Sequence, residues 1–456
     1  MNRINACLHV LTNIFIMTIP MAPIFIFVSL IKPYLDVFLY SYTDILPFVL
    51  FYTFLMVGIF YLQGFGHINN PYKLTLLGML LSILGNIVVL AGLPYHVCWE
   101  LGAVLMGIGL SIAVPMYQTT QDELTRQRHW PYKENMKRDA VLRFLFVIIN
   151  MVIAIVSVKA VLIFYLLLLV SCGYFICHLP VTNKLHFDPI FVPRSNSSRY
   201  YYLIIAFLLL FLTFFVRLLK QTANITYFIY MGIAFAIFMV MLVGMRRHNI
   251  HLYSLQTSWF SEVTNFVILF TVIYYISMKE FIFVFYTMAV FMSGACLIPF
   301  MRPITMRLTK YCSLVTLCNI SSILFLLLLF SSNVYIYMTG VFLCAFSNIQ
   351  AIIVLRQNFM DEMGIHHYEK RLIQAKMRNL GSIGGQTIMM FIIIAGSWFE
   401  TRHGSLALAS YISRDGTITT LDIFDFIKLL CITAIILEGL WLLYISHTRD
   451  GESTLL

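Results

Sequence analysis

The charged stretch that decides the fold is RQNFMDEMGIHHYEKRLIQAKMRNLGSIGGQ, from Arg356 to Gln386. It interrupts an otherwise apolar sequence and leads directly into a segment apolar enough to cross a membrane. A second charged stretch, Asp122–Arg143, also lies between two apolar segments. When the two stretches are aligned on their first aspartates and on Arg143 and Arg378, their spacings differ by only a few residues. Such an internal repeat predicts two related halves.

The composition is typical of an integral membrane protein. Hydrophobic residues make up 60% of the chain, charged residues make up 11%, and the mean hydropathy is +0.87, whereas about a quarter of a soluble domain is charged. Apolar blocks of about 18 to 24 residues recur without the alternation that barrel strands need, which predicts spanning helices. The first block, Leu8–Ile31, is longer than a signal-peptide core. Pro20 and Pro23 within it predict a bend, either static or used in gating.

The apolar blocks number fourteen, and they predict an all-α polytopic membrane protein. We expect an N-terminal six-helix bundle in residues 1–180, a linker with two extra helices in 181–250, and a C-terminal six-helix bundle in 251–456. Both charged stretches then follow the fourth helix of a six-helix half. Lys and Arg concentrate in the segments on the same side as the N-terminus, which predicts that both termini are cytoplasmic.

Three segments of the second half carry recognisable motifs. The sequence YEKRLIQAKMRNLGSIGG (368–385) places an arginine before closely spaced glycines, SGACLIP (293–299) precedes a basic loop with a proline, and HLYSL (251–255) leads into an apolar block. Together they resemble the fourteen-helix drug/proton antiporter branch of the major facilitator superfamily. The first half is less similar, since GFGHINNPYK (64–73) has no acid where that family carries one.

This resemblance implies a major facilitator fold of six, two and six helices and secondary active transport by alternating access. No catalytic motif accompanies it: the sequence has no GxSxG, no phosphate-binding loop with a lysine and no metal-spaced histidines on one helix face. The nine cysteines lack CxxC spacing and are interpreted as small apolar residues. We therefore expect neither an enzyme nor a cofactor or metal, and topology rather than nucleic-acid binding explains the basic residues.

Ionisable residues within apolar segments are costly and are therefore functional candidates. Glu438 lies near the middle of the last predicted helix and is a candidate proton carrier, or a structural carboxyl paired to a neighbouring helix. Glu262 begins the ninth predicted helix, where an acid also suits the helix dipole. Arg143 and Arg378 begin the fifth helix of each half, where they could brace a gate, reach lipid phosphates or contact an anionic substrate.

Uncharged polar residues in the spans are candidates for a substrate cavity, and interhelical hydrogen bonding is the alternative for each of them. The resembled fold places helices one, four and five of each half around the cavity. By that criterion the candidate residues are Asn13, Gln118, Asn150, Asn265, Tyr274, Asn348, Gln350 and Gln386.

The sequence favours a multidrug-type efflux antiporter of the bacterial inner (plasma) membrane that exports a small hydrophobic or amphipathic compound. Its expected partners are that substrate, the bilayer and protons as a candidate coupling ion, with a partner in an export complex also considered. Two alternatives stay open: a flippase or polymerase for lipids, lipid-linked sugars or polysaccharides, and a membrane receptor that transports nothing.

If the two halves are related, their charged stretches face the same side of the membrane. Green fluorescent protein fused near Lys133 and near Lys370 should fluoresce at both sites, because it folds only in the cytoplasm, while alkaline phosphatase at the same sites should be inactive. Opposite results at the two sites would remove the predicted relation between the halves.

Overall fold

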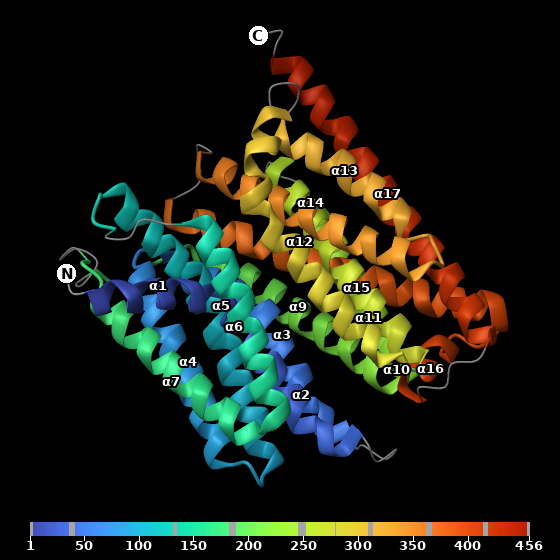
Figure 1. Ribbon diagram of the computed structural model, residues 1–456, viewed down its shortest axis with the longest axis horizontal. Coiled ribbons are helices and arrows are strands. Elements are labelled where there is room, and N and C mark those ends of the chain that lie inside the picture. Colours follow the sequence, from blue (N-terminus) through green and yellow to red (C-terminus); the bar gives the residue numbers. More distant parts are fainter. Residues whose placement is uncertain are drawn as a thin grey trace. The chain divides into compact units, whose positions relative to one another are not determined.

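The computed structural model describes residues 3–35, 42–130, 135–181, 188–244, 252–278, 280–308, 313–361, 367–413 and 418–453, and these are almost entirely helical (Figure 1). Residues 131–134 and 362–366 of the two charged stretches, including Lys133, lie outside the described residues, as do residues 182–187 of the predicted linker.

The elements of the first half of the chain lead from the N-terminus to two helices that follow the linker. They are α1 (Arg3–Thr18), α2 (Met21–Leu35), α3 (Tyr42–Phe65), β1 (His67–Ile68), α4 (Pro71–Ala91), α5 (His96–Arg126), α6 (Met136–Val156), α7 (Val158–Cys177), β2 (Phe191–Val192), α9 (Asn196–Thr222) and α10 (Ile225–Gly244).

The second half is helical throughout its described residues. Its elements are α11 (Leu252–Ser277), α12 (Phe281–Leu308), α13 (Leu314–Leu328), α14 (Val334–Asp361), the short 3₁₀ helix η1 (His367–Glu369), α15 (Lys370–Thr401), α16 (Leu406–Ser413) and α17 (Ile418–Ser453).

Contacts between Cα atoms divide the chain into two compact units. Unit 1 contains Met1–Phe214 and also Gly364–Ala375, and unit 2 contains Phe215–Met363 and Lys376–Leu456. A short piece of the second half therefore packs as part of the first unit. The division into three parts that the sequence suggests stays a prediction.

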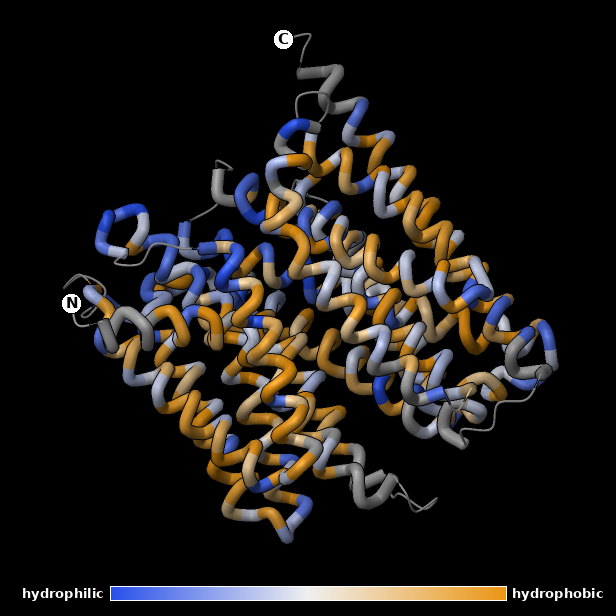
Figure 2. The backbone as a smooth tube through the Cα atoms, viewed as in Figure 1, coloured by the Kyte–Doolittle hydropathy of each residue, from blue (hydrophilic) through white to orange (hydrophobic). Residues whose placement is uncertain are grey.

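The described helices confirm a multi-pass helical membrane protein. Eight of them are long and apolar enough to cross a membrane, or nine if one bent pair counts as a single span. In unit 1, Figure 2 shows hydrophobic residues along α4 and α7. The total of fourteen spans and the cytoplasmic placement of both termini stay predictions.

The bent pair is the first apolar block, which the sequence predicts to bend at its prolines. The axis turns by 60° between Val10–Ile16 and Met21–Phe27. Pro20 lies at this break, between the end of α1 and the start of α2. A proline has no N–H to donate and its ring crowds the preceding turn, which explains why one apolar block forms two helices.

Unit 1 is held together by close packing of α4 on α5 through small residues. A Cβ atom at Gly109 would lie 2.6 Å from the carbonyl oxygen of Gly78, and one at Gly85 would lie 2.7 Å from that of Gly102. Ser82 is fully buried in the same contact. Lipid offers no hydrophobic gain to bring helices together, so close backbone approach with many van der Waals contacts is what stabilises such a pair.

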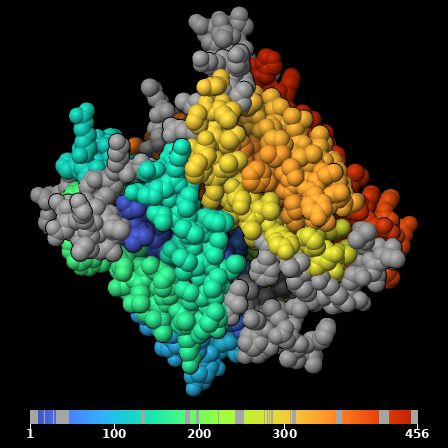
Figure 3. All heavy atoms as spheres, in the orientation of Figure 1, coloured from blue at the N-terminus to red at the C-terminus, as the bar shows by residue number. Residues whose placement is uncertain are grey.

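The opposite face of α4 carries large exposed apolar side chains. Leu77, Leu80, Leu84 and Ile87 are each between 40% and 53% exposed, and they recur at helical spacing. The neighbouring helices α6 and α7, which lie side by side on the face shown in Figure 3, are similarly apolar outside. This surface is suited to contact with lipid chains.

Unit 2 is organised around α14, which packs against α11, α12 and α13, while α17 packs against α11 and α13. The helices α11 and α17 meet at several levels. The Trp259 indole N–H donates to the carbonyl of Ile435 (3.0 Å), and the rings of Phe270 and Phe424 lie 6.4 Å apart. These contacts fix which faces of the two helices point toward each other.

Replacing Gly109 tests the packing of α4 on α5. We expect Gly109→Leu to lower the melting temperature of the purified protein in detergent, or to abolish folding, because its side chain would displace the Gly78 backbone. Gly173→Ala is the control, since the nearest atom to its added Cβ is 3.9 Å away. Equal melting temperatures for Gly109→Leu and the unaltered protein, measured by fluorescence-detected gel filtration after heating, would contradict the packing.

Candidate functional site

The described part of the second-half segment that belongs to unit 1 is His367–Ala375, here called the docking segment. It comprises η1 and the first turns of α15. Its residues at alternate positions, His367, Glu369 and Arg371, each contact a charged or polar group of unit 1. Because α15 continues into unit 2, this helix is shared by the two units.

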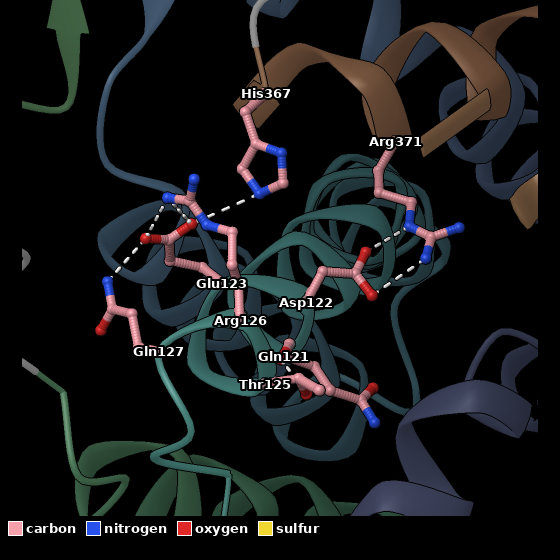
Figure 4. Close-up of polar contacts among 8 residues, drawn as sticks. All are labelled: Gln121, Asp122, Glu123, Thr125, Arg126, Gln127, His367 and Arg371. Atoms are coloured by element: carbon pink, nitrogen blue, oxygen red, sulfur yellow. Dashed lines mark hydrogen bonds and ion pairs between the residues drawn. The ribbon is translucent and has the colours of Figure 1, made fainter. Parts of the chain in front are cut away.

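Arg371 forms a two-point ion pair with Asp122 (Figure 4). Its Nε donates to Oδ2 of Asp122 and its Nη2 donates to Oδ1 at 2.9 Å. The Arg371 side chain is 7% exposed and that of Asp122 is 22% exposed. Asp122 stands in the last turns of α5, where the helix dipole disfavours a carboxylate, so a buried guanidinium beside it offsets an unfavourable position.

Glu123, the next residue, is the most buried acid of this group, with 2% of its side chain exposed. Arg126 Nη2 lies 2.8 Å from both of its oxygens, and Gln127 Nε2 donates to Oε1 at 2.6 Å. His367 Nε2 lies 3.3 Å from Oε2 and forms an ion pair when the imidazole is protonated. Figure 4 marks this contact with a dashed line. These contacts satisfy a carboxylate that could not be buried without partners.

Glu369 joins the docking segment to the two-stranded ribbon. Its Oε1 accepts from His67 Nδ1 at 2.8 Å and lies 3.5 Å from Arg194 Nη2. Arg194 Nε lies 3.2 Å from His67 Nε2, and Arg194 Nη2 lies 2.9 Å from His67 Nδ1. The ribbon pairs His67 with Val192 in antiparallel register, which brings β1 and the linker segment to the same place.

A second polar site lies inside unit 2, where the carboxyl groups of Glu262 of α11 and Glu438 of α17 lie close enough to interact. Two neighbouring carboxylates repel each other, and a proton on one of them removes that repulsion. Among the described residues no basic side chain pairs with either acid. Gly385 of α15 lets the Glu262 side chain fit beside it, because a Cβ at this position would lie 2.6 Å from Glu262 Cγ.

Amide and hydroxyl groups continue this site between α11 and α15. Gln386 Nε2 donates to Oδ1 of Asn265 at 3.0 Å, and Asn265 Nδ2 donates to the carbonyl of Ser382 at 3.3 Å. The hydroxyls of Ser261 and Ser382 lie 3.2 Å apart. We call Ser261, Glu262, Asn265, Ser382, Gln386 and Glu438 the interior polar cluster. It brings together four residues that the sequence had singled out separately.

The other candidate residues of unit 2 lie elsewhere in it. Asn348 Oδ1 accepts from Ser322 at 2.7 Å, between α13 and α14, which is an interhelical hydrogen bond. Gln350 is buried on α14. Tyr274 lines a pocket where α11 ends, some distance along that helix from the interior polar cluster.

Three cavity candidates belong to unit 1. Asn13 on α1 and Asn150 on α6 are buried, and Gln118 is partly buried on α5. Asn150 Nδ2 donates to the carbonyl of Phe146 on its own helix at 2.8 Å. Within the described residues the Oδ1 atoms of Asn13 and Asn150 have no hydrogen-bond partner, so both can still accept one.

The two arginines predicted to act at a gate differ from Arg371 in placement, and only Arg378 lies near the docking segment in the sequence. Arg143 is half-buried on α6, and Arg378 is exposed on α15. Sequence reasoning singled out neither Arg371 nor Glu123. The signal was present, since both lie in the aligned charged stretches, but spacing alone does not assign a partner to each charge.

The comparisons with known proteins bear on the fold. No protein-family model matches the sequence, and a search of curated proteins finds no relative. Among solved structures the chain is similar to the human organic anion transporter MFSD10, with a TM-score of 0.50 and 11% identity over 94% of this chain and 99% of that one. It is similar also to the POT family transporter PepTSo, with a TM-score of 0.50 and 11% identity over 97% and 99%.

The chain has a major facilitator fold. This confirms the fold that the second-half motifs imply, and at 11% identity it concerns the fold alone. The fourteen-helix antiporter branch is a narrower prediction that these structures do not test.

In this major facilitator fold, the Asp122–Arg371 pair should act as one energetic unit. We expect Arg371→Ala to lower the melting temperature by about 5 °C or more, because it leaves a partly buried carboxylate at a helix C-terminus. Asp122→Ala should lower the melting temperature by a similar amount. The decrease in the double variant should be clearly smaller than the sum of the decreases in the two single variants. Arg307→Ala, which removes an exposed arginine, is the control. Strict additivity would show that the two side chains do not stabilise each other.

Proposed function

We propose that this protein is a secondary active transporter that exports a small hydrophobic or amphipathic compound across the bacterial inner membrane by alternating access. The major facilitator fold supports transport as the general activity. The composition supports the substrate class, because a chain with 11% charged and 15% aromatic residues offers few ion-pairing groups and many apolar contacts.

The substrate is bound by amide and hydroxyl side chains in an apolar surrounding. The proposed set is Asn13, Gln118, Asn150, Asn265, Tyr274, Asn348, Gln350 and Gln386. The open acceptors on Asn13 and Asn150 support this role in unit 1. The Asn265–Gln386 pair supports it in unit 2, because a substrate hydroxyl or amine could exchange with the hydrogen bond between the two amides.

The observation that carries proton coupling is the close approach of the Glu262 and Glu438 carboxyl groups. The pair holds one proton between its two carboxyls while it is closed, since a bond between two carboxylates would be repulsive. If the helices part and water enters, each acid is free to ionise and the proton leaves. Whether the proton is bound thus depends on the separation of α11 and α17. Coupling requires such a link between proton binding and the conformation of the protein.

The docking segment supplies the mechanical link in this proposal. Its ion pairs attach the start of α15 to α5 of unit 1, while the interior polar cluster attaches the same helix to α11. A movement of α15 therefore changes the contacts of the docking segment and those of the interior polar cluster. Arg143 and Arg378, about two turns into α6 and α15, are proposed to stabilise the charged stretches on the cytoplasmic side. A partner protein for export stays a prediction.

Everted membrane vesicles test the transport proposal directly. With the chain overproduced and the membrane energised, the fluorescence of Hoechst 33342 or ethidium should change faster than in vesicles without it, because the dye moves into the vesicle lumen. Cells that carry the gene should also tolerate more dye. No movement of either dye, together with unchanged tolerance, would contradict multidrug-type export.

The coupling role is tested by removing the titratable oxygens while keeping side-chain size. We expect Glu262→Gln or Glu438→Gln to lower proton-driven dye transport by at least about tenfold, because neither variant can bind and release the shared proton. Exchange of dye without a proton gradient should continue at close to its original rate. Glu400→Gln, which alters an exposed acid on α15, is the control. Unchanged proton-driven transport by the double Glu262→Gln/Glu438→Gln variant would rule the pair out.

A further inference from the structure

Unit 2 contains a pocket that the interior polar cluster does not reach. Its volume is about 300 Å³, and it lies where α11 ends, where α13 leads into α14, and beside the first turns of α17. The sequence predicts that this end faces outside. Its lining residues, all in unit 2, are Tyr274, Tyr275, Met278, Glu280, Ser331, Ser332, Val334, Tyr337 and Lys428.

Lys428 is the unusual member of this lining, because its side chain is only 6% exposed. Its Nζ donates to Oδ1 of Asp425 at 2.7 Å and lies 5.8 Å from the centre of the Tyr274 ring. An ammonium group has three N–H donors. Among the described residues only Asp425 accepts from this one, so a buried cation beside the pocket keeps donors for a further acceptor.

Aromatic rings form much of the wall and are held in place by their neighbours. The hydroxyl of Tyr337 lies 2.6 Å from Oγ1 of Thr271, and the Tyr337 ring meets that of Tyr275 edge to face with centroids 6.3 Å apart. Tyr275 in turn stands edge to face with Tyr274 at 5.2 Å. Rings fixed in this way give a rigid apolar wall with hydroxyl groups at its edges.

The charges around the pocket define what it can bind. Asp425, Lys428 and the exposed Glu280 together carry one net negative charge, which favours a ligand with a positive group and disfavours a simple anion. Glu280 is the lining carboxylate not engaged by Lys428. The donors left on Lys428 favour an acceptor on the same ligand, because a buried ammonium gains from each hydrogen bond it completes.

We propose that this pocket binds a small zwitterion with an aromatic or otherwise apolar body. The ammonium of the ligand pairs with Glu280, its carboxylate accepts from Lys428, and its apolar part packs on Tyr275 and Tyr337. A pocket of about 300 Å³ accepts a molecule the size of a single aromatic amino acid. This goes beyond the proposed transport, since binding here is a property of unit 2 that is measured without any transport step.

Three probes that differ by one charged group each test the proposal on the purified full-length protein in nanodiscs. L-phenylalanine carries both groups, 2-phenylethylamine lacks the carboxylate, and 3-phenylpropanoate lacks the ammonium. Isothermal titration should show saturable binding of L-phenylalanine, binding of 2-phenylethylamine weaker by about tenfold, and weaker binding still for 3-phenylpropanoate. Equal affinity for the three probes, or no saturable binding of L-phenylalanine, would overturn the proposal.

Two variants test which charged group of the ligand Lys428 and Glu280 each bind. Lys428→Met should remove the preference for L-phenylalanine over 2-phenylethylamine, because only the carboxylate contacts Lys428. Glu280→Gln should weaken both amines by about tenfold, and as an exposed residue it can be changed without threatening the fold. The matched controls are Lys159→Met and Glu400→Gln, both exposed and away from the lining. Unchanged affinities in Glu280→Gln would exclude this pocket, whether or not Lys428→Met folds.

Discussion

The pairing of Arg371 with Asp122 is the interaction on which much of the arrangement depends. It places a piece of the second half within unit 1 and so fixes where α15 begins. The chain could not leave these charges unpaired at low cost. Asp122 and Glu123 stand at the negative end of the α5 dipole, and both are largely removed from water. The docking segment supplies Arg371 and His367 to them, and it places its own acid, Glu369, against His67 and Arg194.

Away from this charged region many hydroxyl groups find their hydrogen-bond partners within the same helix or on a close neighbour. Hydroxyls donate to carbonyls one turn back on the same helix, as in Thr75 to Pro71 and Ser82 to Gly78. Such bonds suit a helix in lipid, where no water is present to accept them. The glycines of α4 and α5 let the backbones approach closely, and the large apolar side chains then face outward. Small residues at the contact of α4 with α5 and large apolar ones on the outer face of α4 suit a helix pair that has lipid as its solvent.

The sequence predicted a multi-pass helical protein because long apolar blocks have one stable form in a bilayer, in which each helix satisfies its own backbone. It also predicted the bend at Pro20, where a missing N–H acts locally. Contacts between residues that lie far apart in the sequence could not be predicted in this way. Glu262 and Glu438 could each be recognised as costly in an apolar segment, but their contact depends on how α11 and α17 pack. The same is true of Arg371, which is one of several arginines in its stretch.

The interior polar cluster and the Lys428 pocket share two helices, α11 and α17, and this limits how they can influence each other. Glu262 and Tyr274 are separated by about 18 Å along α11, and Glu438 and Lys428 by about 15 Å along α17, at 1.5 Å per residue. A ligand at Lys428 therefore cannot touch the carboxyl pair. Any effect of one on the other must pass through the packing of α11 against α17, which Trp259 and Phe270 maintain between them. A shift of either helix alters both sites at once, so coupling between proton and ligand would be a property of this helix pair rather than of any single residue.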